Sequence, residues 1–225
     1  EPTYPLLCLH WAYWSARAAI KGNPLVHFIG DSHTTAFNFQ PRFLTHHIGQ
    51  ATAHNLRNEK STTSSGKIMR KVLSKINKKR DIIALVFGEI DCRIHFHYQH
   101  EKTGTPIAQL IDATISNYGD VMLSLRNAGY KICVCSTAPA ARQQNIYGYP
   151  FYGTAQARSK ITKEFNEKLR IFCEKNSIHF IGVYSQFSDA NGFTLPEYVA
   201  DEVHLNSKIC PFVRSEIRRA FNLQL

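Results

Sequence analysis

The chain has 225 residues, of which 44% are hydrophobic and 20% charged, a composition typical of a globular protein with one sizeable core. No apolar run approaches the roughly 20 residues that cross a bilayer, so we expect no membrane span in this chain. The formal net charge of +10 is compatible with a polyanionic partner, but zinc-finger, RNA-binding and basic-zipper motifs are absent, and we expect no nucleic acid.

The first half of the chain alternates between helix and strand patterns. Residues 10–20, HWAYWSARAAI, predict a helix within an N-terminal helical extension over residues 1–24. Residues 25–30, LVHFIG, predict a strand. Residues 66–80, GKIMRKVLSKINKKR, combine apolar positions at helical spacing with a basic face, which predicts a solvated helix packed on the core. Residues 81–88, DIIALVFG, form a continuous apolar run, typical of a parallel strand that is covered on both faces.

The second half continues the alternation. Helices are predicted over residues 106–129, from about residue 154, and over residues 207–221, with strands over residues 130–137 and 178–183. A proline in the first turn of the helix over residues 106–129 and a glycine at its C-terminal cap fit the known preferences of helix ends.

Strands separated by helices of ten or more residues predict a three-layer α/β/α sandwich with a central parallel sheet, of the flavodoxin-like kind. No Gly/Ser-rich linker divides the chain, so we expect a single domain over residues 1–225. Residues 138–153 are rich in Pro, Gly and Tyr and predict a long loop, and long loops often serve binding. Ligands of such sheets lie beyond the carboxyl ends of the strands, where the polar motifs of this chain fall.

The six cysteines give no disulfide pattern. Cys133 and Cys135 lie two apart in a predicted buried strand, where they are typical of small core residues. A reducing, cytoplasmic compartment is slightly favoured on this ground. The chain begins at Glu1, which leaves an upstream signal or domain open.

The first polar motif follows the first predicted strand, in VHFIGDSHTTAFNF, residues 26–39. Ser32 leads into a predicted helix, so its side chain is exposed and its backbone N–H points outward with the positive end of the helix dipole. Two interpretations are open. Ser32 is either an ordinary helix N-cap, with Asp31 and Thr34 as competitors, or a nucleophile.

Two further motifs occupy comparable places. In GEIDCR, residues 88–93, Glu89, Asp91 and Arg93 follow a strongly apolar strand, with simple ion pairing as the alternative to a functional role. In YVADEVHLN, residues 198–206, Asp201 and His204 are three residues apart. At that spacing an Asp carboxylate can reach the imidazole Nδ1 and leave Nε2 to accept a proton from a serine hydroxyl.

Together, Gly-Asp-Ser after the first strand and Asp-x-x-His before the last helix resemble the SGNH (GDSL-like) hydrolase family, over about residues 26–221. The resemblance implies a three-layer SGNH fold with Ser32 as nucleophile, His204 as general base and Asp201 as orienting acid. It further implies that the backbone N–H groups of Gly49 and Ser32 bind the oxyanion. The stretch around GEIDCR is also similar to a subgroup associated with polysaccharide biosynthesis and O-acylation.

The chain departs from the family pattern at two positions. The family has Gly-x-Asn-Asp, whose Asn amide is the third oxyanion donor, and Ile90 stands in its place. Arg93 is the predicted substitute, held by Glu89 or Asp91, since loss of one such donor typically costs about 10²- to 10³-fold in rate. His33 replaces the leucine of the commoner Gly-Asp-Ser-Leu and either contacts substrate or lies at the helix surface.

The eleven histidines also raise a metal hypothesis. His95 and His97 would share one face of a strand, near His100, and His46 and His47 are adjacent. Typical zinc spacings with Cys or carboxylates are lacking, as are the phosphate-binding motifs G-x-x-x-x-G-K-[ST] and G-x-G-x-x-G. We therefore expect no metal and no cofactor.

Two functions from different classes follow. The first is an SGNH-type esterase or O-acetyltransferase that forms an acyl-Ser32 intermediate on an acylated carbohydrate or other ester, with an acyl donor if it is a transferase. The content of Tyr, Trp and His favours a carbohydrate, because aromatic faces stack on sugars. The second is a non-catalytic glycan-binding domain on the same fold, whose missing asparagine marks lost activity.

Overall fold

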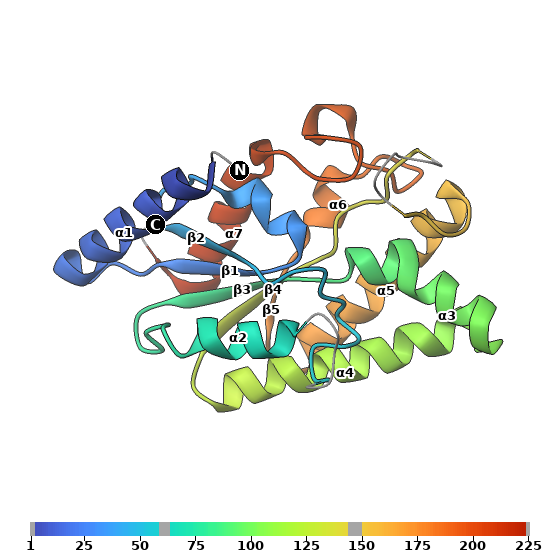
Figure 1. Ribbon diagram of the computed structural model, residues 1–225, viewed down its shortest axis with the longest axis horizontal. Helices are drawn as coiled ribbons and strands as arrows, with labels where there is room; N and C mark the ends of the chain where they lie inside the picture. Colours follow the sequence, from blue (N-terminus) through green and yellow to red (C-terminus); the bar gives the residue numbers. More distant parts are fainter. Residues whose placement is uncertain (1–2, 59–63, 144–149, 224–225) are drawn as a thin grey trace.

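The computed structural model describes residues 3–58, 64–143 and 150–223 and has a central parallel sheet between two helical layers (Figure 1). The five strands are ordered β2-β1-β3-β4-β5, all parallel. They are β1 Val26–Gly30, β2 Phe43–His47, β3 Ile82–Val86, β4 Lys131–Cys135 and β5 His179–Ile181. The α-helices are α1 Thr3–Lys21, α2 Ser65–Leu73, α3 Phe96–Thr103, α4 Ile107–Asn127, α5 Ala155–Lys175, α6 Val183–Phe187 and α7 Cys210–Phe221. The predicted α/β/α fold class is confirmed.

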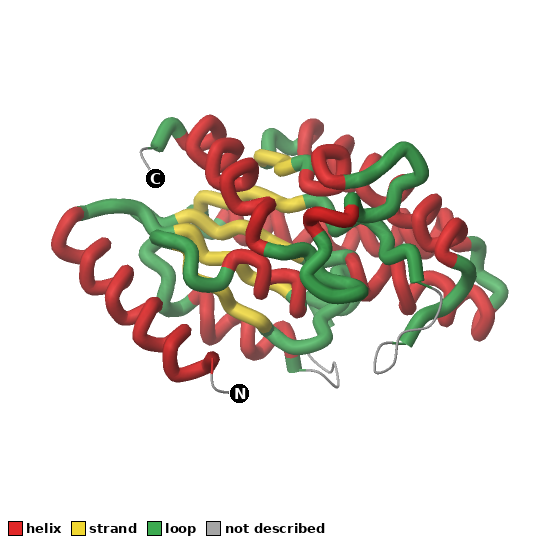
Figure 2. The backbone as a smooth tube through the Cα atoms, turned by 90° about the horizontal axis from the view of Figure 1, so that it is seen from above, coloured by secondary structure: helices red, strands yellow, loops and turns green. Residues whose placement is uncertain are grey.

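Strand β3 shows how the sequence makes two cores. Its alternate residues Ile83 and Leu85 face the layer that contains α2, α4 and α5, whereas Ile82 and Ala84 face the layer that contains α6 and α7. All five residues of β3 are buried, so the strand has no solvent face, and the continuous apolar run follows from burial on both sides. Figure 2 shows the sheet enclosed by helices from this second direction.

Helix α1 lies against the edge of the sheet formed by β2 (Figure 1). Trp11 and Trp14 pack on Leu25, Leu44 and the helix's own Ala18, in a small cluster separate from the two main cores. Among the described residues, none of the helices combines the length and apolar character that crossing a bilayer requires.

Two local predictions are wrong. His95 and His97 do not share a strand face, because residues 91–95 form a π-helical turn, η2, that continues into α3. The segment alternates polar and apolar residues, but its backbone is helical, with Cys92 and Phe96 buried and Phe96 packed against Phe165. The basic helix is also shorter than predicted and ends at Leu73.

The predicted long loop is described in part, since residues 144–149 lie outside the described residues. Its two described flanks are extended or bent, and Ala140 bridges Phe193. Buried Arg158 donates to the carbonyl oxygens of Gln143 (2.5 Å) and Gly153 (2.8 Å). One arginine of α5 therefore fixes both sides of the loop.

Candidate active site

The turn after β1 is built from Gly30 and Asp31. A Cβ at Gly30 would lie 2.0 Å from the carbonyl oxygen of Val86, so only glycine lets β1 end this close to β3. Asp31 is the N-cap of the 3-10 helix η1, Ser32–Phe37, and its Oδ1 accepts the backbone N–H of His33 at 2.9 Å. Ser32 is thus not the cap, and its hydroxyl is left for another partner.

That partner is His204. Ser32 Oγ lies 2.7 Å from His204 Nε2, and His204 Nδ1 lies 2.8 Å from Asp201 Oδ2. Asp201 Oδ1 also accepts the backbone N–H groups of Val203 and His204, each at 2.8 Å. These bonds hold the carboxylate in a tight loop, so Nδ1–H donates to Asp201 and Nε2 accepts the proton of the Ser32 hydroxyl.

The charges around His204 keep its Nε2 available as an acceptor. Burial lowers the pKa of His204, the neighbouring His33 lowers it further, and Asp201 only partly opposes these effects, so the pKa lies below its usual 6.5. For Asp201, burial acts to raise the pKa, but the two backbone N–H groups and His204 bring it below its usual 3.8. Near neutral pH, Asp201 is therefore ionised and His204 neutral, the states that proton abstraction from Ser32 requires.

A second chain of charged side chains leads away from His33. The imidazole of His33 lies with its ring centroid 4.8 Å from that of His204, and its Nε2 is 3.7 Å from Glu89 Oε2. Glu89 in turn binds Arg93, with 2.5 Å from Nε to Oε1 and 3.1 Å from the terminal nitrogen to Oε2. His33 and Arg93 are both more than nine-tenths buried.

This chain stabilises a positive charge on His33. Burial acts to lower the pKa of His33, but Glu89 and Asp31 outweigh it, and the pKa is raised above 6.5. Burial acts to raise the pKa of Glu89, whereas His33 and Arg93 lower it to about 2. His33 is therefore not a surface residue of the helix but a buried imidazole with a raised pKa next to the serine–histidine pair.

Arg93 joins this charged chain to the long loop. A third nitrogen of its guanidinium donates to the carbonyl oxygen of Pro150 at 2.7 Å, and its carbon lies 5.3 Å from the ring centroid of Phe151. Of the two predicted holders of Arg93, Glu89 is the one that binds it.

Asp91 instead holds the loop that follows Gly49. Its two carboxylate oxygens accept the backbone N–H groups of Ala53 (2.6 Å) and His54 (3.2 Å). Burial raises the pKa of Asp91 to about 7 despite these bonds. Gly49 is the second residue after β2 and has a φ of +87°, and the preceding Ile48 N–H donates to the carbonyl oxygen of Gly30 at 2.9 Å. The Gly49 loop thus lies beside the Ser32 turn.

A cavity of about 270 Å³ borders His204 and is lined by Arg142, Thr194 and Glu202, together with Ala141, Gln143, Pro196, Val199 and Val203. The start of the long loop therefore lines the same cavity as His204. Across the described residues, no group of three or more His, Cys, Asp or Glu side chains is arranged to hold a metal ion.

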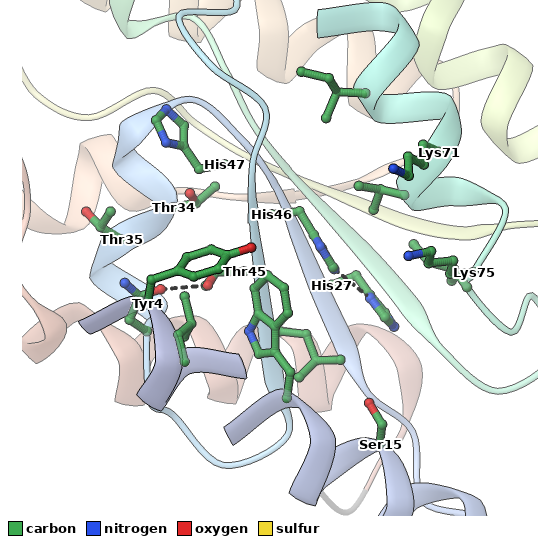
Figure 3. A pocket seen from close by; sticks show the side chains of 17 residues that line it. Tyr4, Ser15, His27, Thr34, Thr35, Thr45, His46, His47, Lys71 and Lys75 are labelled. Atoms are coloured by element: carbon green, nitrogen blue, oxygen red, sulfur yellow. Dashed lines mark hydrogen bonds between the residues drawn. The ribbon is translucent and has the colours of Figure 1, made fainter. Parts of the chain in front are cut away.

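A larger cavity of about 590 Å³ lies between α1, β2 and α2, and its lining includes Thr34 and Thr35 but not Ser32 (Figure 3). Lys71 of α2 and Lys75 of the turn that follows it line this cavity, and Tyr4 lies on its α1 side. His27 and His46 stack there with 3.0 Å between Nδ1 and Nε2.

The sequence did not indicate the contact between Glu89 and His33 or the one between Asp91 and the Gly49 loop. The available signal was the charge of residue 89, an ionisable side chain directly after a buried strand, which needs a buried partner of opposite charge. Arg142 and Glu202, which line the cavity beside His204, carried no signal in the sequence.

No family model and no curated protein matches the chain by sequence. Solved structures are similar in fold, and three of them show the extent of the likeness. A GDSL-like lipase from Bacteroides thetaiotaomicron has a TM-score of 0.60 at 18% identity, covering 95% of this chain and 97% of its own. The acetyl xylan esterase AlAXEase has a TM-score of 0.52 at 19% identity, covering 87% and 98%. A catalytic mutant of Axe2, an acetylxylan esterase from Geobacillus stearothermophilus, has a TM-score of 0.56 at 13% identity, covering 89% and 95%. The chain has the fold of the SGNH (GDSL-like) hydrolases.

Proposed function

We propose that this protein is a serine-dependent ester hydrolase or O-acyltransferase that acts on an acylated carbohydrate through an acyl-Ser32 intermediate. The observation that carries the proposal is the continuous hydrogen-bonded series from Asp201 through His204 to the Ser32 hydroxyl, with distances of 2.8 and 2.7 Å. The role of each residue follows from what it contacts.

In the first half-reaction, Ser32 Oγ bonds to the ester carbonyl carbon while its proton passes to His204 Nε2. The carbonyl electron pair moves onto the oxygen, and Asp201 stabilises the imidazolium that forms on His204. Collapse of the tetrahedral intermediate breaks the bond to the sugar oxygen, which takes the proton from His204. The acyl group then remains on Ser32.

In the second half-reaction, His204 removes a proton from water or from a sugar hydroxyl, whose oxygen attacks the acyl carbon. Ser32 leaves and regains its proton from His204. Water as the nucleophile gives an acid and makes the protein an esterase, whereas a sugar hydroxyl gives a new ester and makes it a transferase.

For the oxyanion we propose the backbone N–H groups of Ser32 and Gly49, with the His33 imidazolium in place of the asparagine that Ile90 replaces. Arg93 binds both oxygens of Glu89 and the Pro150 carbonyl, so we propose that it acts through Glu89 rather than directly. A fixed cation in a partly desolvated site stabilises developing negative charge without the reorganisation that solvent would need.

Two observations support a carbohydrate substrate. The solved structures of similar fold include acetyl xylan esterases. The cavity beside His204 is lined by charged and hydroxyl side chains, Arg142, Glu202 and Thr194, which can form hydrogen bonds with sugar hydroxyls.

The test is labelling of the folded protein with a fluorophosphonate, read by intact mass and peptide mapping. We expect one adduct, on Ser32, with release of p-nitrophenol from p-nitrophenyl acetate that Ser32→Ala abolishes. Ser15→Ala, an exposed serine on α1, is the matched control and should leave both signals unchanged. Absence of an adduct on Ser32 in correctly folded protein would contradict the proposal and favour a glycan-binding domain.

Substrate and reaction type need a separate measurement. Acetylated xylooligosaccharides are incubated with the protein, and released acetate is measured. A second reaction contains p-nitrophenyl acetate and an unacetylated oligosaccharide. Gain of acetyl mass by the oligosaccharide identifies a transferase, and acetate release alone identifies an esterase.

A further inference from the structure

Helix α1 carries two apolar stripes, of which only one is used in the fold. The inner stripe, Leu7, Trp11, Trp14 and Ala18, is buried or half-buried against the edge of the sheet. The outer stripe consists of Leu6, Leu9, Tyr13, Ala16 and Ile20. Leu9, Tyr13 and Ile20 are 67%, 56% and 80% exposed. Figure 2 shows α1 as the outermost element at this edge, with no other described element beyond it.

The spacing of the outer stripe is that of a helix–helix interface. Its five members follow one another at intervals of three, four, three and four residues, the pattern of positions a and d in a coiled coil. At 100° per residue they fall within an arc of roughly 80°. Single exposed apolar residues are common on protein surfaces, but an aligned row of this kind marks an interaction site.

We propose that the outer stripe of α1 pairs with the same stripe of a second copy of this chain, antiparallel and about a twofold axis. With Tyr13 placed opposite the partner's Ala16, Leu9 comes opposite the partner's Ile20, and symmetry repeats both contacts. The large Tyr13 side chain then faces a small alanine, and the Leu9 side chain faces an aliphatic isoleucine. The neighbouring Ala12 and Ala19 are small and exposed, which allows the two helix backbones to approach closely.

The charges on α1 favour this antiparallel arrangement. The helix has no acidic residue, and its cations Arg17 and Lys21 lie near its C-terminal end. A parallel pair would place these cations side by side. In the antiparallel register the two Lys21 residues are roughly 20 Å apart along the axis, beyond the Debye length of about 8 Å in physiological salt, and the two Arg17 residues are roughly 8 Å apart. The remaining repulsion between two chains of net charge +10 predicts that added salt strengthens the pairing.

The area of the stripe sets the strength of the pair. From their exposed fractions, its large side chains can bury roughly 500 Å² per copy, or about 1,000 Å² in total. This is the lower limit for a specific interface, so we expect a weak dimer with a dissociation constant in the micromolar range or above. The stripe lies on the side of α1 that faces away from β2, and the pairing does not depend on the function proposed for Ser32.

The proposal is tested by sedimentation equilibrium from about 5 to 500 µM protein at low and high salt. We expect a reversible monomer–dimer equilibrium that Leu9→Glu weakens at least about 100-fold, because the pair would bury an unpaired carboxylate. Ile171→Glu is the matched control, since Ile171 is an exposed apolar residue of α5 (51%) outside the stripe, and it should leave the equilibrium unchanged.

The register is tested by exchanging the large and small side chains. Tyr13→Ala should weaken the dimer and Ala16→Tyr should prevent it, whereas the double variant Tyr13→Ala/Ala16→Tyr should restore it. Circular dichroism melting confirms that each variant folds. A wild-type monomer at every concentration overturns the proposal, as does binding of α1 to phosphatidylcholine–phosphatidylglycerol vesicles that Leu9→Glu abolishes in place of dimerisation. Failure of the double variant to restore the dimer overturns the register.

Discussion

Substitution of His33 by leucine, the residue of the commoner Gly-Asp-Ser-Leu motif, tests the oxyanion mechanism most directly. A unit positive charge about 5 Å from the oxyanion in a partly desolvated site stabilises it by roughly 3 kcal/mol. Repulsion of the imidazolium that forms on His204, whose ring lies 4.8 Å from that of His33, offsets part of this stabilisation. Glu89, 3.7 Å from His33 Nε2, offsets a further part of it. We therefore expect kcat/KM to fall about 10²-fold, the lower end of the range for one lost oxyanion donor.

The pH profile separates this role from a structural one. Catalysis requires a neutral His204, whose pKa lies below 6.5, and a protonated His33, whose pKa lies above 6.5, so the wild-type profile of kcat/KM is bell-shaped around neutral pH. His33→Leu removes the alkaline limb. It also moves the acid limb to higher pH, because a cation that lowers the pKa of His204 is gone. His100→Leu, an exposed histidine of α3, is the matched control and should leave both limbs in place.

Restoring the family's asparagine provides the decisive comparison. If His33 replaces that donor, Ile90→Asn should raise the activity of His33→Leu to within about tenfold of wild type and change the wild-type activity little. Activity is measured with p-nitrophenyl acetate on variants whose melting curves are intact. An equal effect of Ile90→Asn in both backgrounds would refute the reasoning, as would a His33→Leu variant with unchanged rate and profile.

Three further predictions concern Asp201, the turn after β1 and two buried acids. Asp201→Asn should lower kcat by up to about 10⁴-fold while the protein still folds, because Asn favours the wrong tautomer of His204; steady-state kinetics with a thermal melt checks this. Gly30→Ala should cost several kcal/mol or prevent folding, because its Cβ would lie 2.0 Å from the Val86 carbonyl oxygen, and urea unfolding measures the loss. The raised pKa values of Asp31 (about 6) and Asp91 (about 7) mean that the native state binds more protons than the unfolded state from about pH 4 upward. Stability should therefore fall as pH rises from 4 to 7, by up to about 1.4 kcal/mol per pH unit for each group, and Asp91→Asn should flatten this slope in urea titrations at several pH values.

The parts of the fold that were predictable are those whose burial is visible in the sequence itself. Residues 82–86 are buried on both faces, so their side chains had to be apolar throughout. Strand β2, Phe43–His47, gave no comparable signal, because it lies at the edge of the sheet and ends in two histidines that are not fully buried. The segment 93–97 gave a misleading signal. Its alternation of polar and apolar residues is typical of a strand, whereas the structure has a helix here, in which Phe96 packs on Phe165.

The candidate site divides in the same way. Asp201 and His204 could be paired from sequence because a three-residue spacing allows their contact within one turn, and the pairing with Ser32 came from the resemblance. No local rule connects His33 with Glu89, which lie on different strand ends and meet only because β1 and β3 are neighbours in the sheet. Strand order is a property of the whole chain, so this contact required the structure.

The charges of His33, Glu89 and Arg93 also explain why substitutions at these positions should differ in their cost to stability. Glu89 is the only anion that contacts both His33 and Arg93 among the ion pairs of the described residues. Removing His33 leaves Glu89 with the two-point contact to Arg93, so the buried charges remain balanced. Removing the charge of Glu89 leaves two buried cations without their common partner, which is far more costly. Substitution of His33 should therefore change the chemistry of the site while the fold persists. Substitution of Glu89 should affect both the chemistry and the fold, so Glu89 is as much a part of the site as His33.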